Sequence, residues 1–417
     1  MELVSPQPFW RLKNGLGASL PRFEADTECE VLIVGGGISG LLTAHALTRV
    51  GVDTMLIDAW DFAAASTSAS TALLMYELDT PLVELARLRG EDVARAVYRE
   101  SARSVDAFAR LAADVGHRDF RWRESVFLAS TPDDVDLLER EYLARKSIGL
   151  EIERLETATL RERYGFTNPL ALKSAKAAEI DPYVFCYQLL DAALIQGLKA
   201  YDRAEMTGLN LPKDGGRITA KINGEHQIHA RHLILATGYA AAAYLPDDFL
   251  TLKSTFAMAT KPLADAEKFL RGSLIWESSH PYCYVRGTMD GRLVIGGLDE
   301  DFKNSELRDR LLPMKQKALA KKLQDFFPDL ELEPGYGWAG TFCETPDGMP
   351  LIGTPPGLRN VHFALGYGGN GVTFSLLAAE ILTDLVRGKT HPTAELFSFA
   401  RLETPRTQPR FQLPAER

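Results

Sequence analysis

The sequence predicts an α/β + β fold, in which a Rossmann-type nucleotide-binding domain carries an inserted, mainly antiparallel β domain. Three observations support this prediction. A buried strand, a glycine turn, a helix and a second strand follow one another within residues 29–59. Another glycine-rich turn precedes a helix at Gly366–Gly371, and residues 249–300 form short segments of alternating polarity. A chain of 417 residues is long enough for two domains.

The composition is that of a globular protein and argues against several classes of function. The net charge of −9 disfavours nucleic acid as a partner, because phosphate contacts need basic surface. No apolar run reaches the roughly 18 residues of a membrane-spanning helix, and the N-terminus lacks a leader pattern. We therefore expect no integral membrane segment and a cytoplasmic location. The spacing of the cysteines predicts reduced thiols and no metal site: Cys29, Cys186, Cys283 and Cys343.

The first glycine turn has the pattern of a dinucleotide site. Glu30–Val34 reads as a buried strand, and Gly35, Gly37 and Gly40 form a G-x-G-x-x-G motif. The first glycine permits a tight turn, the second lets the backbone approach a pyrophosphate, and the third lets helix and strand pack closely. The helix that begins at Ile38 offers free N–H groups to phosphates. The alternative is a tight strand-to-helix turn that binds no ligand.

The chain after this helix supplies further candidate contacts. Asp58 closes the second strand and is placed to accept a hydrogen bond from a ribose hydroxyl. Residues 63–72 contain only small and hydroxyl side chains, which let a bulky ligand approach the backbone and donate to phosphate oxygens. A flexible linker is the alternative for this segment.

Regular elements are expected through the middle of the chain. Asp181 and Pro182 have the pattern of a helix N-cap and first position, and Asn223-Gly224 predicts a hairpin turn. A buried strand then ends at Thr237-Gly238, where ligands bind in open α/β sheets. Further helices are expected at Glu91–Val115, Asp133–Ser147, Pro313–Phe326 and Val372–Val386, and further strands at Asp119–Ala129, Tyr282–Arg286, Arg292–Gly296 and Asn360–Leu365.

Two glycine turns some 330 residues apart fit one extended cofactor that is contacted at both ends. The turn at Gly35–Gly40 would hold the pyrophosphate, and the turn at Gly366–Gly371 would direct a helix N-terminus at the reactive ring. A flavin gains negative charge on two-electron reduction, which N–H groups and a helix dipole stabilise. A nicotinamide becomes neutral and has no such need. We therefore expect a flavin, with an NAD-dependent Rossmann enzyme as the alternative.

The motifs GGGISGLLTAHAL, ILATG and TPDGMPLIG…NVHFALGYGGNG, with the acid at Asp58, resemble the D-amino-acid-oxidase-type FAD-dependent oxidoreductases, which include glycine and sarcosine oxidases. The resemblance implies a glutathione-reductase-like FAD fold. It implies an FAD-binding domain from residues 28–75, 150–245 and 335–398, a substrate domain from 76–149 and 246–334, and an N-terminal arm at 1–27. It assigns the cofactor contacts to Gly35, Gly37, Ile38, Ser39, Gly40, Asp58, Ser66, Ser70, Thr71, Ala72, Gly238, Gly340, Gly368, Gly369, Asn370, Gly371, Val372 and Thr373.

The resemblance also bears on how FAD is held. Relatives of the sarcosine oxidase type attach FAD through a cysteine at the position that matches Gly340 in this chain. Cys343 lies nearby but out of register. The expected cofactor is therefore non-covalent FAD.

The reaction implied by the resemblance is oxidation of a carbon–nitrogen bond in a small-molecule amine or amino acid, with hydride transfer to flavin N5. The flavin itself carries this chemistry, so no catalytic side chain is assigned. Arg286 is the candidate clamp for a substrate carboxylate, because its planar fork suits two oxygens, and a surface salt bridge is the alternative. Tyr282, Tyr284 and Tyr367 are candidate pocket residues. Two alternatives for the whole protein are a dehydrogenase that passes electrons to a quinone or protein, and a non-catalytic flavin-binding assembly factor.

Overall fold

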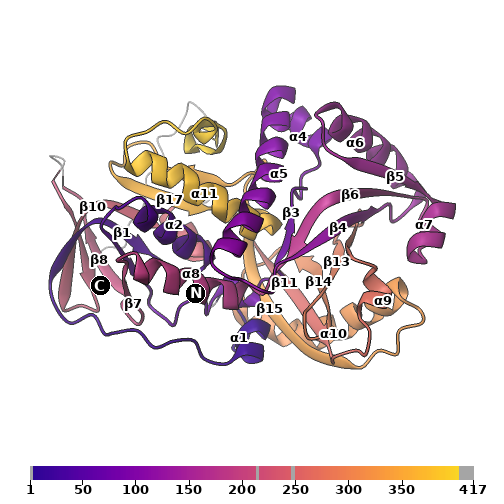
Figure 1. Cartoon of the computed structure of the whole chain (residues 1–417), viewed down its shortest axis with the longest axis horizontal. Coiled ribbons are helices and arrows are strands. Elements are labelled where there is room, and N and C mark those ends of the chain that lie inside the picture. The colour runs from indigo at the N-terminus through magenta and orange to yellow at the C-terminus, as the bar shows by residue number, and fades with distance from the viewer. Residues whose placement is uncertain (1–2, 213–215, 246–248, 403–417) are drawn as a thin grey trace.

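The computed structural model describes residues 3–212, 216–245 and 249–402, and Figure 1 shows two β-sheets lying side by side with helices packed on both. The first sheet has eight strands. Six of them follow the order β16-β17-β10-β1-β2-β7, and β9 pairs with both β10 and β8. Their bounds are β1 Thr27–Val34, β2 Thr54–Ile57, β7 Lys199–Tyr201, β8 Met206–Asn210, β9 Ile218–Ile222, β10 His226–Leu235, β16 Leu351–Gly353 and β17 Val361–Leu365.

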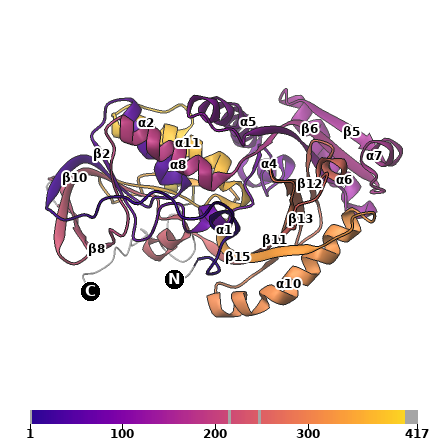
Figure 2. The same cartoon turned by 60° about the horizontal axis from the view of Figure 1, so that its bottom comes forward.

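The first sheet is built as a nucleotide-binding sheet. β1 pairs in parallel with β2 and β10, β2 pairs in parallel with β7, and β10 pairs in parallel with β17. Val31, Leu32 and Ile33 of β1 are fully buried, which suits a central strand that is covered on both faces. α2 (Ile38–Arg49), α8 (Pro182–Ile195) and α11 (Gly371–Val386) pack together over one face (Figure 2).

The second sheet has nine strands in the order β15-β11-β14-β13-β12-β4-β6-β3, with β5 paired to β6. Every pairing is antiparallel except β12 with β4. The bounds are β3 Leu73–Met75, β4 Arg121–Leu128, β5 Ile152–Glu156, β6 Leu170–Glu179, β11 Thr251–Thr260, β12 Ser273–Glu277, β13 Cys283–Gly287, β14 Leu293–Glu300 and β15 Pro334–Glu344.

The strands are divided between the two sheets differently from the domain ranges expected from the sequence. The ranges 150–245 and 335–398 were expected in the nucleotide-binding domain, but β5, β6 and most of β15 belong to the second sheet. β3 also pairs there, although it falls within residues 28–75. Which sheet a strand joins depends on long-range pairing that a local pattern does not specify. We therefore propose that residues 150–179 and the strand at 334–344 belong to the substrate domain.

The remaining helices are α1 Phe9–Asn14, α3 Ser66–Ala69, α4 Leu82–Arg89, α5 Glu91–Asp114, α6 Val135–Ser147, α7 Thr157–Tyr164, α9 Glu267–Leu270 and α10 Ser305–Phe326, with 3-10 turns at Pro132–Asp134, Gly238–Tyr244, Gly368–Asn370, Ala394–Phe397 and Phe399–Leu402. The prediction that a helix begins at Pro313 is wrong. α10 begins eight residues earlier, where the Asn304 side chain accepts from the Leu307 N–H, and Pro313 lies inside the helix.

The N-terminal arm is less irregular than expected. Phe9 and Trp10 are buried, as predicted, but they lie on the short helix α1. The Phe9 ring stacks on Trp338 at 5.1 Å between ring centroids. Val4 pairs with Gly340 of β15, so the arm extends along the edge of the second sheet.

Two further features concern the whole described chain. Its four cysteines are all buried and free of disulfides. Over the residues that the structure describes, no helix has both the length and the apolar character that crossing a bilayer requires.

The predicted N-cap of α8 also anchors the arm. Asp181 Oδ1 accepts the N–H groups of Tyr183 and Val184, each at 3.1 Å. Its Oδ2 accepts from the Lys13 ammonium and the Asn14 amide, each at 2.9 Å. One buried carboxylate therefore serves two elements.

Replacing this carboxylate should weaken both elements. We predict that Asp181→Ala lowers the free energy of unfolding by about 2 kcal/mol, as the sum of a lost cap and lost charged hydrogen bonds. Urea denaturation measures the change. Asp191→Ala, at an exposed position of the same helix, is the control and should change stability little. Equal losses for the two variants would contradict this role of Asp181.

Candidate active site

The first glycine turn has the close contacts that its motif predicts. Gly35 has φ +114°, and a Cβ there would lie 2.3 Å from the Ala236 carbonyl oxygen, at the end of β10. A Cβ on Gly40 would lie 1.8 Å from the Gly35 oxygen. α2 begins after Gly37 without a side-chain cap. The turn therefore brings helix and strand together and leaves the helix N-terminus for a ligand.

Asp58 braces this turn. Its Oδ2 accepts the Gly36 N–H at 2.6 Å, and its Oδ1 accepts the Trp60 N–H at 2.8 Å. Burial raises the pKa of Asp58 to about 6. The acid thus lies beside the glycine turn, where the sequence predicts a ribose contact.

The small-residue segment is a short helix, α3, and not a linker. Thr67 Oγ1 accepts the Ile38 N–H at 3.0 Å, which joins α3 to the first turn of α2. The Trp338 indole donates to the Ala69 carbonyl at 2.8 Å, and the Trp10 indole donates to the Ser70 carbonyl at 2.6 Å. Two tryptophans from distant parts of the chain therefore fix this segment.

The second glycine turn connects β17 to α11. Asn370 Nδ2 donates to the Glu77 carbonyl at 2.6 Å, and Thr373 Oγ1 donates to the Met75 carbonyl at 3.1 Å. The Gly369 N–H, which we expected to face a ligand ring, donates to the Asp79 carboxylate at 2.7 Å. The turn is thus held against the strand that follows α3.

The N-terminal parts of α2 and α11 contact one another. Ser39 Oγ and Ser375 Oγ lie 2.8 Å apart, although the two residues are 336 positions apart in sequence. Figure 1 shows the two helices side by side. Their N-termini therefore border one region, which is what a single extended ligand requires.

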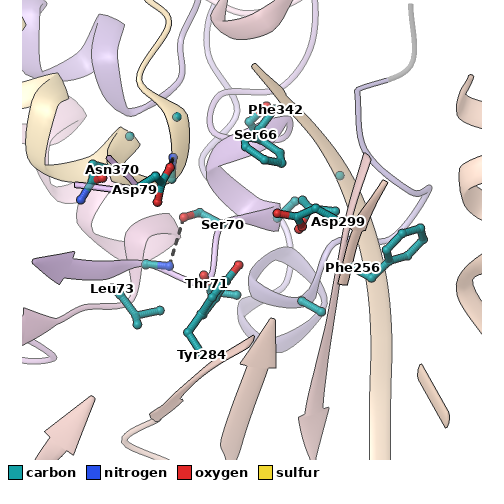
Figure 3. A pocket seen from close by; sticks show the side chains of 18 of the residues that line it. Ser66, Ser70, Thr71, Leu73, Asp79, Phe256, Tyr284, Asp299, Phe342 and Asn370 are labelled. Carbon is teal, nitrogen blue, oxygen red and sulfur yellow. Dashed lines mark hydrogen bonds between the residues drawn. The ribbon is translucent and has the colours of Figure 1, made fainter. Parts of the chain in front are cut away.

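A cavity lies where the second sheet faces the small-residue segment and the second glycine turn. Both predicted sets of residues line it. The cofactor set contributes Ser66, Ser70, Thr71, Ala72, Gly340 and Gly368–Gly371, and the substrate set contributes Tyr282 and Tyr284. Figure 3 shows Asp79 and Asn370 on one side of Ser70 and Asp299 on the other.

One hydroxyl of a residue that lines the cavity has no hydrogen-bond partner among the residues that the structure describes. Ser66 Oγ is buried and makes no hydrogen bond. This hydroxyl is therefore available to a polar group of the ligand that occupies the cavity.

Comparison with known proteins decides the family. The family model for FAD-dependent oxidoreductases (DAO) matches residues 30–385. The chain belongs to the DAO family of FAD-dependent oxidoreductases. FAD is therefore its cofactor, and the turns and cavity described above fit this group. We propose that residues of both glycine turns, Asp58 and Ser66 would hold it; of these, the second turn and Ser66 line the cavity.

Similar proteins span most of the chain. A putative Rieske 2Fe-2S iron–sulfur protein of Bacillus subtilis is 25% identical over 408 residues, covering 95% of this chain and 76% of its own. The γ-glutamylputrescine oxidoreductase of Escherichia coli is 26% identical over 388 residues, covering 86% and 84%. The crystal structure of glycine oxidase from Geobacillus kaustophilus superposes with a TM-score of 0.74 at 20% identity, covering 91% and 99%.

The structure does not bring two predicted substrate residues to the cavity of this DAO protein. Tyr367 is buried away from it. Arg286 is only 2% exposed, and its guanidinium donates to the carbonyls of Thr71, Ala72 and Ile180 at 3.1, 2.8 and 2.8 Å. Neither the carboxylate clamp nor the surface salt bridge describes this arginine, which instead holds backbone beside the FAD segment.

Other residues of the cavity were missed by sequence reasoning. Tyr239 directly follows the predicted turn at Gly238, which has φ +57° and does not line the cavity itself. Glu77 and Asp79 follow the small-residue segment, and this adjacency was an available signal. Asp299 lies near the end of β14 and has no local signature.

Gly40 offers a direct test of the FAD turn. We predict that Gly40→Ala purifies with at least about 10-fold less FAD, because its methyl group displaces α2 from the turn, while alanine otherwise favours the helix. The ratio of flavin to protein absorbance measures this. Ala46→Gly, further along α2, lowers only the helix propensity of its position, so this variant should purify with its full FAD content. Full FAD content in Gly40→Ala would contradict the close packing of this turn.

Proposed function

We propose that this protein oxidises the carbon–nitrogen bond of an amine or amino acid. The observation that carries the proposal is the shared cavity, where the second glycine turn and the Ser66–Ala72 segment meet the wall formed by Tyr282 and Tyr284. Relatives named γ-glutamylputrescine oxidoreductase and glycine oxidase support this substrate class. Their names concern amines and amino acids, and the family chemistry is redox.

When bound, FAD would supply a two-electron acceptor for oxidation of the carbon–nitrogen bond to an imine, which water would hydrolyse to a carbonyl compound and ammonia or an amine. The chain supplies position and surroundings. Trp276, Tyr282 and Tyr284 form an aromatic wall that limits water and orients the substrate. The amine must arrive with a free lone pair, because a protonated nitrogen has none to form the double bond.

We also propose that FAD is held without a covalent bond. Gly340 lines the cavity and has no nucleophilic side chain. Cys343 is buried and does not line the cavity, and burial raises the pKa of its thiol to about 12. A buried thiol that stays protonated is a poor nucleophile.

A second candidate differs in the electron acceptor. One relative is named as an iron–sulfur protein, which favours transfer of electrons to a protein or quinone in place of oxygen. The substrate half of the reaction is the same for both candidates. They are separated only by how the reduced flavin is reoxidised.

Anaerobic mixing tests the proposal. We expect at least one member of a panel of amines and D- and L-amino acids to bleach the flavin absorption of the purified protein. Admitting air then separates the candidates: rapid recovery of the absorption indicates an oxidase, and slow recovery indicates a dehydrogenase. A panel that leaves the flavin oxidised throughout would contradict the proposed function and favour a binding role.

A further inference from the structure

The charge of the cavity narrows the substrate class. Its lining includes three carboxylates, Glu77, Asp79 and Asp299, and within the described chain no lysine, arginine or histidine lines it. Cationic groups do lie behind the wall, but they are engaged. Lys253 pairs with Glu344 at 2.8 Å, and Arg286 is bonded to backbone carbonyls.

The three carboxylates are neutralised to different extents. Glu77 lies 3.4 Å from the buried Arg145, which also pairs with Glu141 at 2.7 Å, so one cation serves two acids. Asp79 accepts from the Tyr282 hydroxyl at 2.9 Å and from a backbone N–H, both uncharged donors.

Asp299 has a carboxylate oxygen that is free to accept a hydrogen bond from a substrate. Its Oδ1 is buried and makes no hydrogen bond. Burial is the main cause that raises the pKa of Asp299 to about 6; a hydrogen bond with Thr255 acts against this rise, and the neighbouring carboxylate of Asp79 contributes to it. An unpaired oxygen in this position is costly unless a donor arrives with the substrate. Glu77 Oε2, on a side chain only 2% exposed, is likewise without a hydrogen bond.

Aromatic rings complete the surroundings of these acids. The rings of Tyr282 and Tyr284 lie 5.7 Å apart, and Trp276 and Phe256 also line the cavity. Ring faces attract cations, and carboxylates pair with ammonium groups. The same surroundings disfavour a substrate carboxylate, which would be desolvated beside like charges and without a cationic partner.

We propose that the substrate is a cationic amine that carries no carboxylate beside the reacting carbon, and that Asp299 binds a substrate ammonium group. This inference rests on the proposed function, because it requires the substrate to enter this cavity. For a diamine, the ammonium at one end pairs with Asp299 while the nitrogen at the other end is oxidised as the neutral amine. Asp79 is less suited to this role because both of its oxygens already accept hydrogen bonds from the protein, and Glu77 is less suited because its charge is paired with Arg145.

Matched substrate pairs test the inference. Putrescine and ornithine differ only by a carboxylate, as do cadaverine and lysine, and each pair is mixed anaerobically with the FAD-loaded protein. We expect the amine of at least one pair to reduce the flavin at least about 10-fold more efficiently than either enantiomer of its amino acid, the loss expected for one unpaired buried charge. Faster reduction by the amino acids would overturn the inference and leave the proposed function intact. If no compound of a wider panel reduces the flavin, the proposed function fails and this inference fails with it.

A variant pair tests the role of Asp299. Asp299→Asn should lower the efficiency of flavin reduction by the preferred amine about 10- to 100-fold, mainly through weaker binding, and narrow the preference over the amino acid. Asp136→Asn removes an acid whose side chain is 80% exposed on α6 and should leave both values unchanged. FAD content and circular dichroism show whether each variant is folded. An unchanged preference in folded Asp299→Asn would overturn the assignment of this residue.

Discussion

The structure depends on the contact between the N-terminal parts of α2 and α11. The hydrogen bond between Ser39 and Ser375 holds together two helix N-termini that come from opposite ends of the chain. Each N-terminus carries partial positive charge and N–H groups that its own helix does not satisfy. Bringing two such ends together is unfavourable unless electron-rich groups lie against them. The carboxylates of Asp58 and Asp79 supply part of this, and FAD, with its diphosphate and ring carbonyls, is suited to supply the rest.

The second sheet fixes the geometry of the cavity from the other side. Arg286 reaches from β13 to the carbonyls of Thr71 and Ala72, and the indole of Trp338 reaches from β15 to Ala69. These hydrogen bonds join the Ser66–Ala72 segment to the sheet that carries Tyr282 and Tyr284. A buried guanidinium is stabilised here by backbone carbonyls and by Glu179 at 3.5 Å. The Ser66–Ala72 segment is therefore fixed to the sheet that carries Tyr282 and Tyr284.

Sequence reasoning succeeded where structure is determined locally. The turn at Gly35–Gly40, the cap at Asp181 and the hairpin at Asn223-Gly224 each depend on the backbone preferences of a few adjacent residues, and all three are present. Sequence reasoning failed where the environment of a residue is determined by segments distant in the sequence. The groups that surround Arg286 come from three separate parts of the chain. The Asp299 oxygen is unpaired because no donor from another part of the described chain lies within hydrogen-bond distance of it. No local pattern reports either fact.

The central claim is that two distant glycine turns bind opposite halves of one FAD molecule. A crystal structure of the FAD complex tests it most directly. The account predicts one FAD per chain, with its pyrophosphate at the Gly35–Gly40 turn and its flavin ring at Gly368–Gly371. A flavin ring bound away from the second turn, or separate ligands at the two turns, would contradict it.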